Sequence, residues 1–437
     1  MLSMHRPRSI LALIATPLLL YVGLQWYMLN NLLLSSSPAH PSRLKPLSAP
    51  PAHQESAGDQ IHRHEKTCPE RRNLVFLKGM KCATNTLIGM LTLFAFKRNL
   101  SVALPMDKLI YHNWPYPMTK RDVRPTHRRE YNMIFHHAIY TPSVMQALMP
   151  PNTVYISIIR QPFSHLQSVF RYFNVAEIAG LSGLEPDNLV EYFSDVERHE
   201  EAYKSPRAQR RWCIPDGFSV TRNLQSHCHG MPLGFPAGTQ DISGNTVAVD
   251  EYIRELSRSF KLVMIVEHLY ESVILLRRLM CWEFKDIVFV SNNIAHAPKG
   301  GRVKQNDPHI MEFHKRWSHV DYRLYDYFNK TLWKHISTHG SGFYREVKAF
   351  KAVQRRVERY CLDVYSRVNE NEPLPTHTEA SSEWSRKFSI SAEDCRILGP
   401  NPYKILHKMQ NTSNTLDKDL LHEAAKIADV RQHKSLC

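Results

Sequence analysis

The chain has 437 residues, 43% hydrophobic and 10% aromatic, which is enough for at least one large folded domain. Its formal net charge of +15 favours anionic partners, such as nucleic acid, anionic lipid, or phosphorylated or sulfated small molecules. The sequence has neither a zinc-finger spacing nor an aromatic–basic RNA-binding pattern, so we expect no nucleic-acid partner.

The N-terminus combines a basic tail with a long uncharged segment. Residues 1–9 contain Arg6 and Arg8, and residues 10–29 read ILALIATPLLLYVGLQWYML. As a helix, such a segment is about 30 Å long and crosses the hydrocarbon core of a bilayer. We therefore expect a cytosolic tail and a transmembrane signal anchor. A cleaved signal peptide is the alternative, although its apolar region would be unusually long.

Residues 30–67 are rich in proline and serine and predict an extended stem without a core of its own. A short tail, one span, a stem and a large luminal part are typical of a Golgi-resident type II enzyme, although receptors and lectins share this layout. We expect a single-pass Golgi membrane protein with a luminal catalytic domain. The sequons at Asn99, Asn329 and Asn411 are compatible with a luminal location.

The lumen is oxidising, so some of the eight cysteines are expected to form disulfides whose pairing the sequence leaves open. Cys281 lies in an apolar helical pattern and is expected to be a buried thiol. The candidates for pairing are Cys68, Cys213, Cys228, Cys361, Cys395 and Cys437.

Apolar runs alternate with helical patterns from residue 71 onward, which predicts an α/β fold with an open parallel sheet flanked by helices. Leu166, Val169 and Phe173 illustrate the helical spacing after the third run. The expected strands end at Leu77, His137, Ile159, Val266 and Val290.

We expect the catalytic domain to span residues 68–347 and a C-terminal appendage to span 348–437. Within the appendage, residues 369–385 predict a surface loop and residues 416–430 predict an amphipathic helix.

Chemically useful residues follow the expected strands. Lys78 and Lys81 lie in a strand-to-helix loop, where backbone N–H groups and the helix dipole favour a phosphate. The loop lacks the Walker A spacing. An ordinary turn with solvated lysines is the alternative for this segment alone.

Arg160 ends the third expected strand, and Ser168 follows in the next helix. An arginine fork with a serine can bind a second phosphate. An arginine that only pairs with an acidic neighbour is the alternative. Together with the first loop, the segment predicts a ligand with two separated anionic groups.

The two segments resemble the nucleotide-binding segments of sulfotransferases that use 3′-phosphoadenosine 5′-phosphosulfate (PAPS). More narrowly, segments such as RRNLVFLK, YNMIFHHAIY and TVYISIIRQPFSHLQSVFRYF resemble those of the galactose 3-O-sulfotransferase family, over residues 68–346. The resemblance implies a P-loop-like sulfotransferase fold and PAPS as the sulfate donor. The PAPS-binding residues that it implies are Lys78, Gly79, Lys81, Cys82, Ala83, Thr84, Asn85, Thr86, Arg160 and Ser168.

Some loop residues depart from the family pattern. Gly79 and Cys82 replace threonines, Asn85 replaces a serine, Met80 stands where some members have histidine, and Gln161 replaces an aspartate. Backbone donors survive these changes, so we still expect the phosphosulfate to bind.

His137 and Lys81 are the expected catalytic residues. His137 matches a family histidine and suits deprotonation of the acceptor hydroxyl, whereas neighbouring His136 faces the other way along a strand. Lys81 suits stabilisation of the sulfate and the leaving phosphate. Nothing in the sequence requires a metal.

The family resemblance implies transfer to the 3-hydroxyl of a β-galactose on a glycolipid or glycan. A relative without activity that binds glycan or nucleotide is one alternative. A Golgi glycosyltransferase is another, but its D-x-D motif would have to be Asp417-Lys418-Asp419 in the appendage, which better fits the first turn of a helix.

Overall fold

The computed structural model describes residues 68–106, 110–126, 130–181, 187–205, 214–291, 308–367, 375–399 and 402. The expected tail, signal anchor, stem and C-terminal helix lie outside these residues. Within the described ranges, no helix is long and apolar enough to cross a membrane.

A four-stranded parallel sheet, in the order β3-β1-β5-β6, lies at the centre of the fold. The strands are short and almost entirely buried, as expected of a parallel sheet that helices cover. The expected α/β class is therefore confirmed. The bounds are β1 Leu74–Leu77, β3 Met133–Ile134, β5 Val154–Ile159 and β6 Leu262–Ile265.

The order of these strands creates a switch point between β1 and β5. The chain passes from β1 to β3 on one side, whereas it passes from β5 to β6 on the other. Open α/β sheets bind ligands beyond the carboxyl ends of the strands at such a point. Lys78 directly follows β1 and Arg160 directly follows β5, so both lie at this position.

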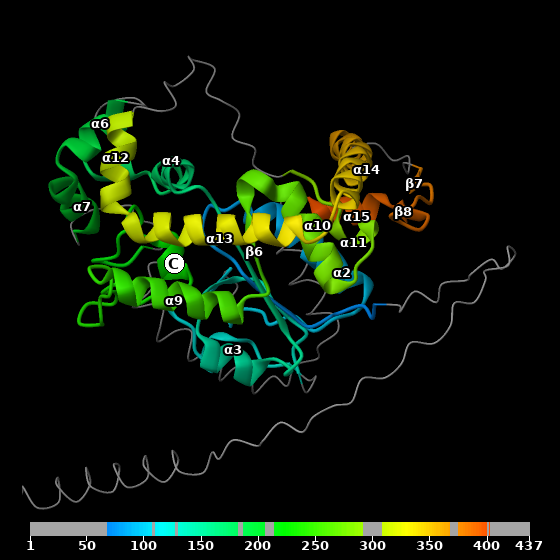
Figure 1. Cartoon of the computed structure of the whole chain (residues 1–437), viewed down its shortest axis with the longest axis horizontal. Coiled ribbons are helices and arrows are strands. Elements are labelled where there is room, and N and C mark those ends of the chain that lie inside the picture. The colour runs from blue at the N-terminus through cyan, green and yellow to red at the C-terminus, as the bar shows by residue number, and fades with distance from the viewer. Residues whose placement is uncertain are drawn as a thin grey trace, which may run out of the picture. The chain divides into compact units, whose positions relative to one another are not determined.

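Helices surround the sheet. Figure 1 shows α13 crossing the molecule beside α9, with α6, α7 and α12 near one of its ends and α10, α14 and α15 near the other. The helices are α2 Thr84–Lys97, α3 Pro142–Leu148, α4 Pro162–Tyr172, α5 Val175–Ile178, α6 Asp187–Ser194, α7 Val196–Lys204, α8 Leu224–Cys228, α9 Thr246–Ser259, α10 Leu269–Met280, α11 Phe284–Ile287, α12 Pro308–Trp317, α13 His319–Ser337, α14 Gly342–Ser366 and α15 Ala392–Leu398, with 3₁₀ turns η1 Lys120–Asp122 and η2 Val266–His268.

The second expected strand is divided, so the prediction of one strand ending at His137 was wrong. After β3 the chain leaves the sheet, and His137 begins β4 (His137–Ile139), which pairs in parallel with β2 (Tyr111–Pro117) in a separate two-stranded sheet. The two halves of this apolar run therefore have different partners.

The prediction of a strand that ends at Val290 was also wrong. Residues 284–287 form α11, and Val288, Phe289 and Val290 are buried but outside any strand. The side chain of Gln354 takes the place of a neighbouring strand, because it accepts from the Phe289 N–H at 3.1 Å and donates to the Phe289 carbonyl. Burial without a ladder partner explains why the apolar pattern misled the prediction.

The C-terminal part packs on the same core as the sheet. Helix α14 runs through the boundary expected at 347/348, and its residues Phe343, Phe350 and Val357 belong to the main core. Part of the segment expected as a loop forms β7 (His377–Glu379), which pairs with β8 (Phe388–Ile390). A disulfide between Cys361 and Cys395 joins α14 to α15.

The other described cysteines correct the expected pairing. Cys281 is not a buried thiol but pairs with Cys68, because it lies at the C-terminal end of α10, next to the incoming chain. Cys228 is a buried free thiol, as is Cys82. Cys213 and Cys437 lie outside the described residues.

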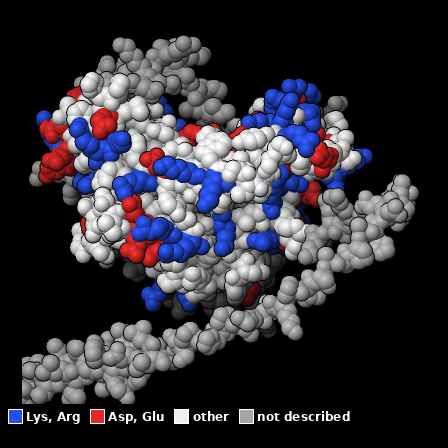
Figure 2. Space-filling view, in the orientation of Figure 1, with Lys and Arg blue, Asp and Glu red and all other residues white. Residues whose placement is uncertain are grey.

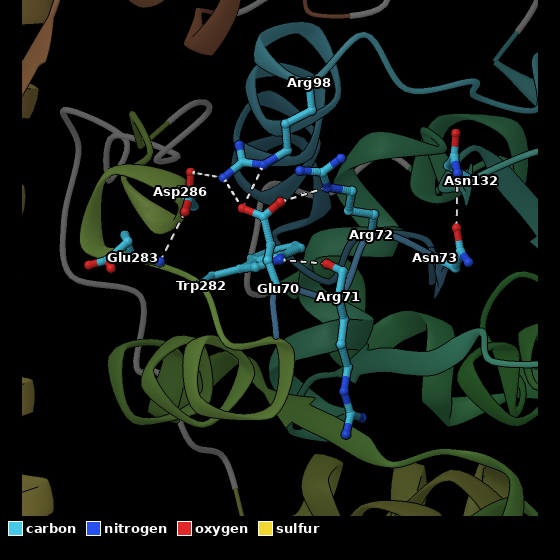
Figure 3. Close-up of polar contacts among 9 residues, drawn as sticks. All are labelled: Glu70, Arg71, Arg72, Asn73, Arg98, Asn132, Trp282, Glu283 and Asp286. Atoms are coloured by element: carbon cyan, nitrogen blue, oxygen red, sulfur yellow. Dashed lines mark hydrogen bonds and ion pairs between the residues drawn. The ribbon is translucent and has the colours of Figure 1, made fainter. Parts of the chain in front are cut away.

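An ion-pair network secures the same N-terminal segment at the amino end of β1 (Figure 3). Arg98, after α2, donates to Glu70 at 2.8 Å through Nε and to Asp286 of α11 at 2.8 Å through Nη2. Trp282 donates to the Arg71 carbonyl at 2.9 Å. Arg98 thus joins the segment before β1 to α2 and α11.

Charged residues are distributed unevenly over the surface. Figure 2 shows that Lys and Arg gather over α14 and mix with Asp and Glu over α9 and α13. The positive net charge is therefore not confined to the strand ends.

We predict that Arg98→Ala lowers the free energy of unfolding by about 3–5 kcal/mol, because it leaves the buried Asp286 carboxylate without its charged partner. Only 4% of the Asp286 side chain is exposed. Arg72→Ala is the matched control, since Arg72 contacts the same Glu70 from a side chain that is 57% exposed, and it should cost less than about 1 kcal/mol. Urea unfolding measures the free energy of unfolding of both variants. Equal losses of stability in Arg98→Ala and Arg72→Ala would contradict the assignment of Arg98 as the partner of a buried carboxylate.

Candidate active site

The loop between β1 and α2 has an unusual backbone and leads into an uncapped helix N-terminus. Lys81 and Ala83 adopt left-handed φ angles of 58° and 53°, an uncommon conformation for residues other than glycine. Ala83 is the N-cap of α2 and provides no side-chain cap, and the first turn of α2 contains no acidic residue. The first N–H groups of this helix are therefore available to an anion.

Lys78 is buried at the tip of β1, with 1% of its surface exposed. Burial, followed by repulsion from Lys81, holds its pKa well below the usual range. Its Nζ lies 3.4 Å from the Asn85 Oδ1 of α2. A bound anion would stabilise the charged form of this lysine.

Lys81 is also partly desolvated, although it lies nearer the surface than Lys78. Burial lowers its pKa, and the positive charges of Arg160 and Arg171 lower it further. Its Nζ lies 3.9 Å from the centroid of the Tyr172 ring, at the C-terminal end of α4. The structure thus brings Lys81 and Arg160 together, as the sequence predicted.

Arg160 is fixed through its backbone. Its N–H donates to Gln225 Oε1 at 2.7 Å, and its carbonyl accepts from Gln225 Nε2 at 2.9 Å. The guanidinium donates to the Lys81 carbonyl at 3.5 Å, while the buried Nε has no hydrogen-bond partner among the described residues. This unused donor supports the expectation of an anionic ligand.

Ser168 lies half-buried on α4, two turns beyond Arg160. No hydrogen bond to another described residue engages its hydroxyl. Its role in binding a second phosphate stays a prediction.

His137 contacts the same strand end although it begins β4. Its Nδ1 lies 3.2 Å from the Lys78 carbonyl. A carbonyl oxygen can only accept, so Nδ1 carries the proton and Nε2 carries the lone pair. Burial and the charge of Lys78 hold the His137 pKa well below its usual range, so the neutral form is favoured. The geometry presents Nε2 as a proton acceptor.

Two further residues that sequence analysis missed stabilise the loop. His165 of α4 donates from Nε2 to the Met80 carbonyl at 2.8 Å. Gln225 of α8 accepts from the Cys82 thiol at 3.4 Å as well as bonding to Arg160. His165 lies within the family-like segment between Arg160 and Ser168, but neither it nor Gln225 stands out in the sequence, because each acts through contacts across the fold.

Helix α8 is itself held by α13. The buried Asp321 carboxylate accepts from the N–H groups of Gln225 and Ser226 at 3.1 and 2.7 Å. Burial raises the pKa of Asp321 to about 6. Asn223 accepts from the Val320 N–H at 3.2 Å. Asn223 is therefore a structural residue between α8 and α13.

The part of the chain that the structure describes contains no group of three or more His, Cys, Asp or Glu residues that could hold a metal ion. The D-x-D sequence at 417–419 lies outside it.

The site has cations and N–H donors that suit an anionic phosphoryl or sulfuryl group. Comparison with known proteins identifies the enzyme family to which the chain belongs. The family model described as galactose-3-O-sulfotransferase matches residues 2–390. The chain belongs to this family and is a carbohydrate sulfotransferase, and the glycosyltransferase alternative is dropped. The family implies a sulfate donor.

Individual relatives agree with this assignment. The chain is 29% identical to galactosylceramide sulfotransferase from Bos taurus over 75% of its length and 71% of the relative. It is 30% identical to galactose-3-O-sulfotransferase 2 from Sus scrofa, over 67% of this chain and 70% of the relative. It is 28% identical to galactose-3-O-sulfotransferase 3 from Homo sapiens, over 82% of this chain and 77% of the relative.

We predict that Gln225→Leu weakens binding of the sulfate donor, because it removes the amide that fixes the Arg160 backbone. It should also lower the free energy of unfolding by about 1–3 kcal/mol, since the Arg160 N–H and carbonyl lose their partners. Gln354→Leu is the matched control, because Gln354 is a buried amide that bonds to the Phe289 backbone instead. Calorimetric titration with the sulfate donor should show weaker binding for Gln225→Leu and unchanged binding for Gln354→Leu. Equal donor affinities in the two variants would contradict the role of Gln225 in positioning Arg160.

Proposed function

We propose that this protein transfers the sulfuryl group of PAPS to the 3-hydroxyl of a β-galactose. The observation that carries the proposal is the meeting of Lys78, Lys81 and Arg160 beside the uncapped N-terminus of α2. Such a set of cations and free N–H groups suits a ligand with several phosphate or sulfate oxygens.

We assign the two halves of the donor to the two strand ends. The loop from Lys78 to Thr86 would hold the 5′-phosphosulfate, and Arg160 with Ser168 would hold the 3′-phosphate. The position of the two segments on either side of the β1–β5 switch point supports this division. The fold would then be the P-loop-like sulfotransferase fold.

His137 would act as the general base. Its Nε2 would accept the proton of the acceptor hydroxyl as that oxygen forms a bond to sulfur and the bond from sulfur to the phosphate oxygen breaks. Lys81 would stabilise the sulfate oxygens and the negative charge that develops on the leaving phosphate. Lys78, at the start of the loop, would add a second positive charge beside the phosphosulfate.

The acceptor and the location are part of the proposal. The relatives carry the names galactosylceramide sulfotransferase and galactose-3-O-sulfotransferase, which favours a galactose-containing glycolipid or glycan. The apolar residues 10–29 favour a Golgi membrane protein whose catalytic part faces the lumen.

We predict that the protein transfers labelled sulfate from PAPS to galactosylceramide, lactose or galactose-terminated N-glycans. His137→Ala should lower kcat by about 10²–10⁴-fold, because it removes the general base, while PAPS still binds. His314→Gln is the matched control, since His314 is another buried histidine but lies on α12 and bonds to the Tyr322 hydroxyl at 3.0 Å. Transfer that survives in His137→Ala would exclude this base, and absence of PAPS binding in the wild type would exclude the function.

The low pKa of His137 predicts an unusual pH profile. The neutral base is present above its pKa, which lies below the usual 6.5, so kcat/KM for PAPS should persist as the pH falls through 6.5 and decline only in more acidic solution. Bound PAPS would offset the charges of Lys78 and Lys81, which should raise the pKa and move the acid limb of kcat to higher pH. Stopped-assay profiles, with folding checked at each pH, measure both. An acid limb of kcat/KM above pH 6.5 would contradict the prediction.

A further inference from the structure

Tyr172 combines a solvent-exposed ring with a position against the proposed catalytic lysine. It is the last residue of α4 and is 47% exposed. Its ring nevertheless covers Lys81, with Nζ 3.9 Å from the centroid. An exposed aromatic ring so close to a reacting group is available to a ligand that enters from solvent.

Tyr111 connects this ring to the proposed base. Burial and, after it, the neighbouring Tyr172 hydroxyl raise the pKa of Tyr111, so the two phenols lie close together. The Tyr111 ring also lies 5.3 Å from the His137 ring, between centroids, at an interplanar angle of 33°. One tyrosine therefore contacts Lys81 and the other contacts His137, the two groups between which the proposed reaction requires the acceptor hydroxyl.

The contact between Lys81 and Tyr172 is suited to exchange. A cation–π contact at a partly exposed site is weak, whereas a charge-assisted hydrogen bond from an ammonium group to an anion is stronger. Lys81 should therefore leave the ring for the sulfate oxygens when the donor binds. The face of Tyr172 then becomes free.

A pyranose ring matches what the two tyrosines offer. One face of galactose presents mainly C–H groups, which pack against an aromatic ring, and its hydroxyls bond to phenolic oxygens. Tyr111 and Tyr172 supply both kinds of contact at the edge of the site.

We propose that Tyr172, supported by Tyr111, is the residue that positions the acceptor galactose. Its ring holds Lys81 before the donor binds and afterwards stacks on the C–H face of the sugar, with the 3-hydroxyl directed towards His137. This inference rests on the proposed function and adds to it a surface that selects the acceptor.

The test compares Tyr172→Ala and Tyr172→Phe in the full-length protein. Tyr172→Ala should raise the acceptor KM by about 5- to 15-fold, because the stacking surface is lost, and leave the PAPS dissociation constant within about twofold. Tyr172→Phe retains the ring and should raise the acceptor KM by no more than about threefold. Tyr344→Ala is the matched control, since Tyr344 is also exposed, at 55%, but lies on α14, and it should change neither constant.

The outcomes separate this inference from the proposed function. A weaker PAPS affinity in Tyr172→Ala with an unchanged acceptor KM would show that the ring only positions Lys81, and would overturn the inference alone. An equal rise of the acceptor KM in Tyr172→Phe and Tyr172→Ala would also overturn it, because stacking would not be the cause. A wild-type protein that neither binds PAPS nor sulfates a galactoside would overturn both proposals.

Discussion

The crowding of positive charge at the ends of β1 and β5 is the constraint on which the rest of the site depends. Lys78 is buried, Lys81 is partly buried, and Arg160 lies close enough to lower the Lys81 pKa. Without an anion, this arrangement costs desolvation and repulsion. Burial and, after it, the charge of Lys78 hold the pKa of His137 well below its usual range, and the resulting neutral imidazole is the form that can accept a proton. The positive charges that suit an anionic ligand therefore also favour the neutral form of His137.

The local parts of this site could be predicted from sequence, whereas the contacts that hold them could not. Apolar runs that end in Lys78 and Arg160 identify two strand ends, because a buried parallel strand has a characteristic composition. Gln225 is different, since it reaches Arg160 from a helix 65 residues further along the chain. The divided strand before His137 and the buried Phe289 were mispredicted for a related reason: hydrophobicity reports burial but not the partner of the backbone.

Strand β1 carries the site although it has only four residues, so its position must be fixed from outside. At its amino end, the Cys68–Cys281 disulfide and the Arg98 network join the preceding segment to α10 and α11. At its carboxyl end, His165 holds the Met80 carbonyl. Helices or their ends provide the restraints at both ends of this short strand.

The departures from the family pattern change side chains while keeping the groups that bind an anion. A Cβ at Gly79 would lie 3.4 Å from Cys82 Sγ and from the Ile158 carbonyl, so the two positions where threonines are replaced pack on each other. The Cys82 thiol donates to the Met80 carbonyl and to Gln225, which are contacts that a threonine hydroxyl could also make. Gln161 still accepts from the Ser164 N–H at 2.7 Å, as an aspartate cap would. The Glu267 carboxylate, which accepts from the Gln161 N–H at 3.1 Å, places a negative charge at the N-terminus of α4. The changes at Gly79, Cys82 and Gln161 therefore alter side chains and leave the backbone N–H groups of the loop in place.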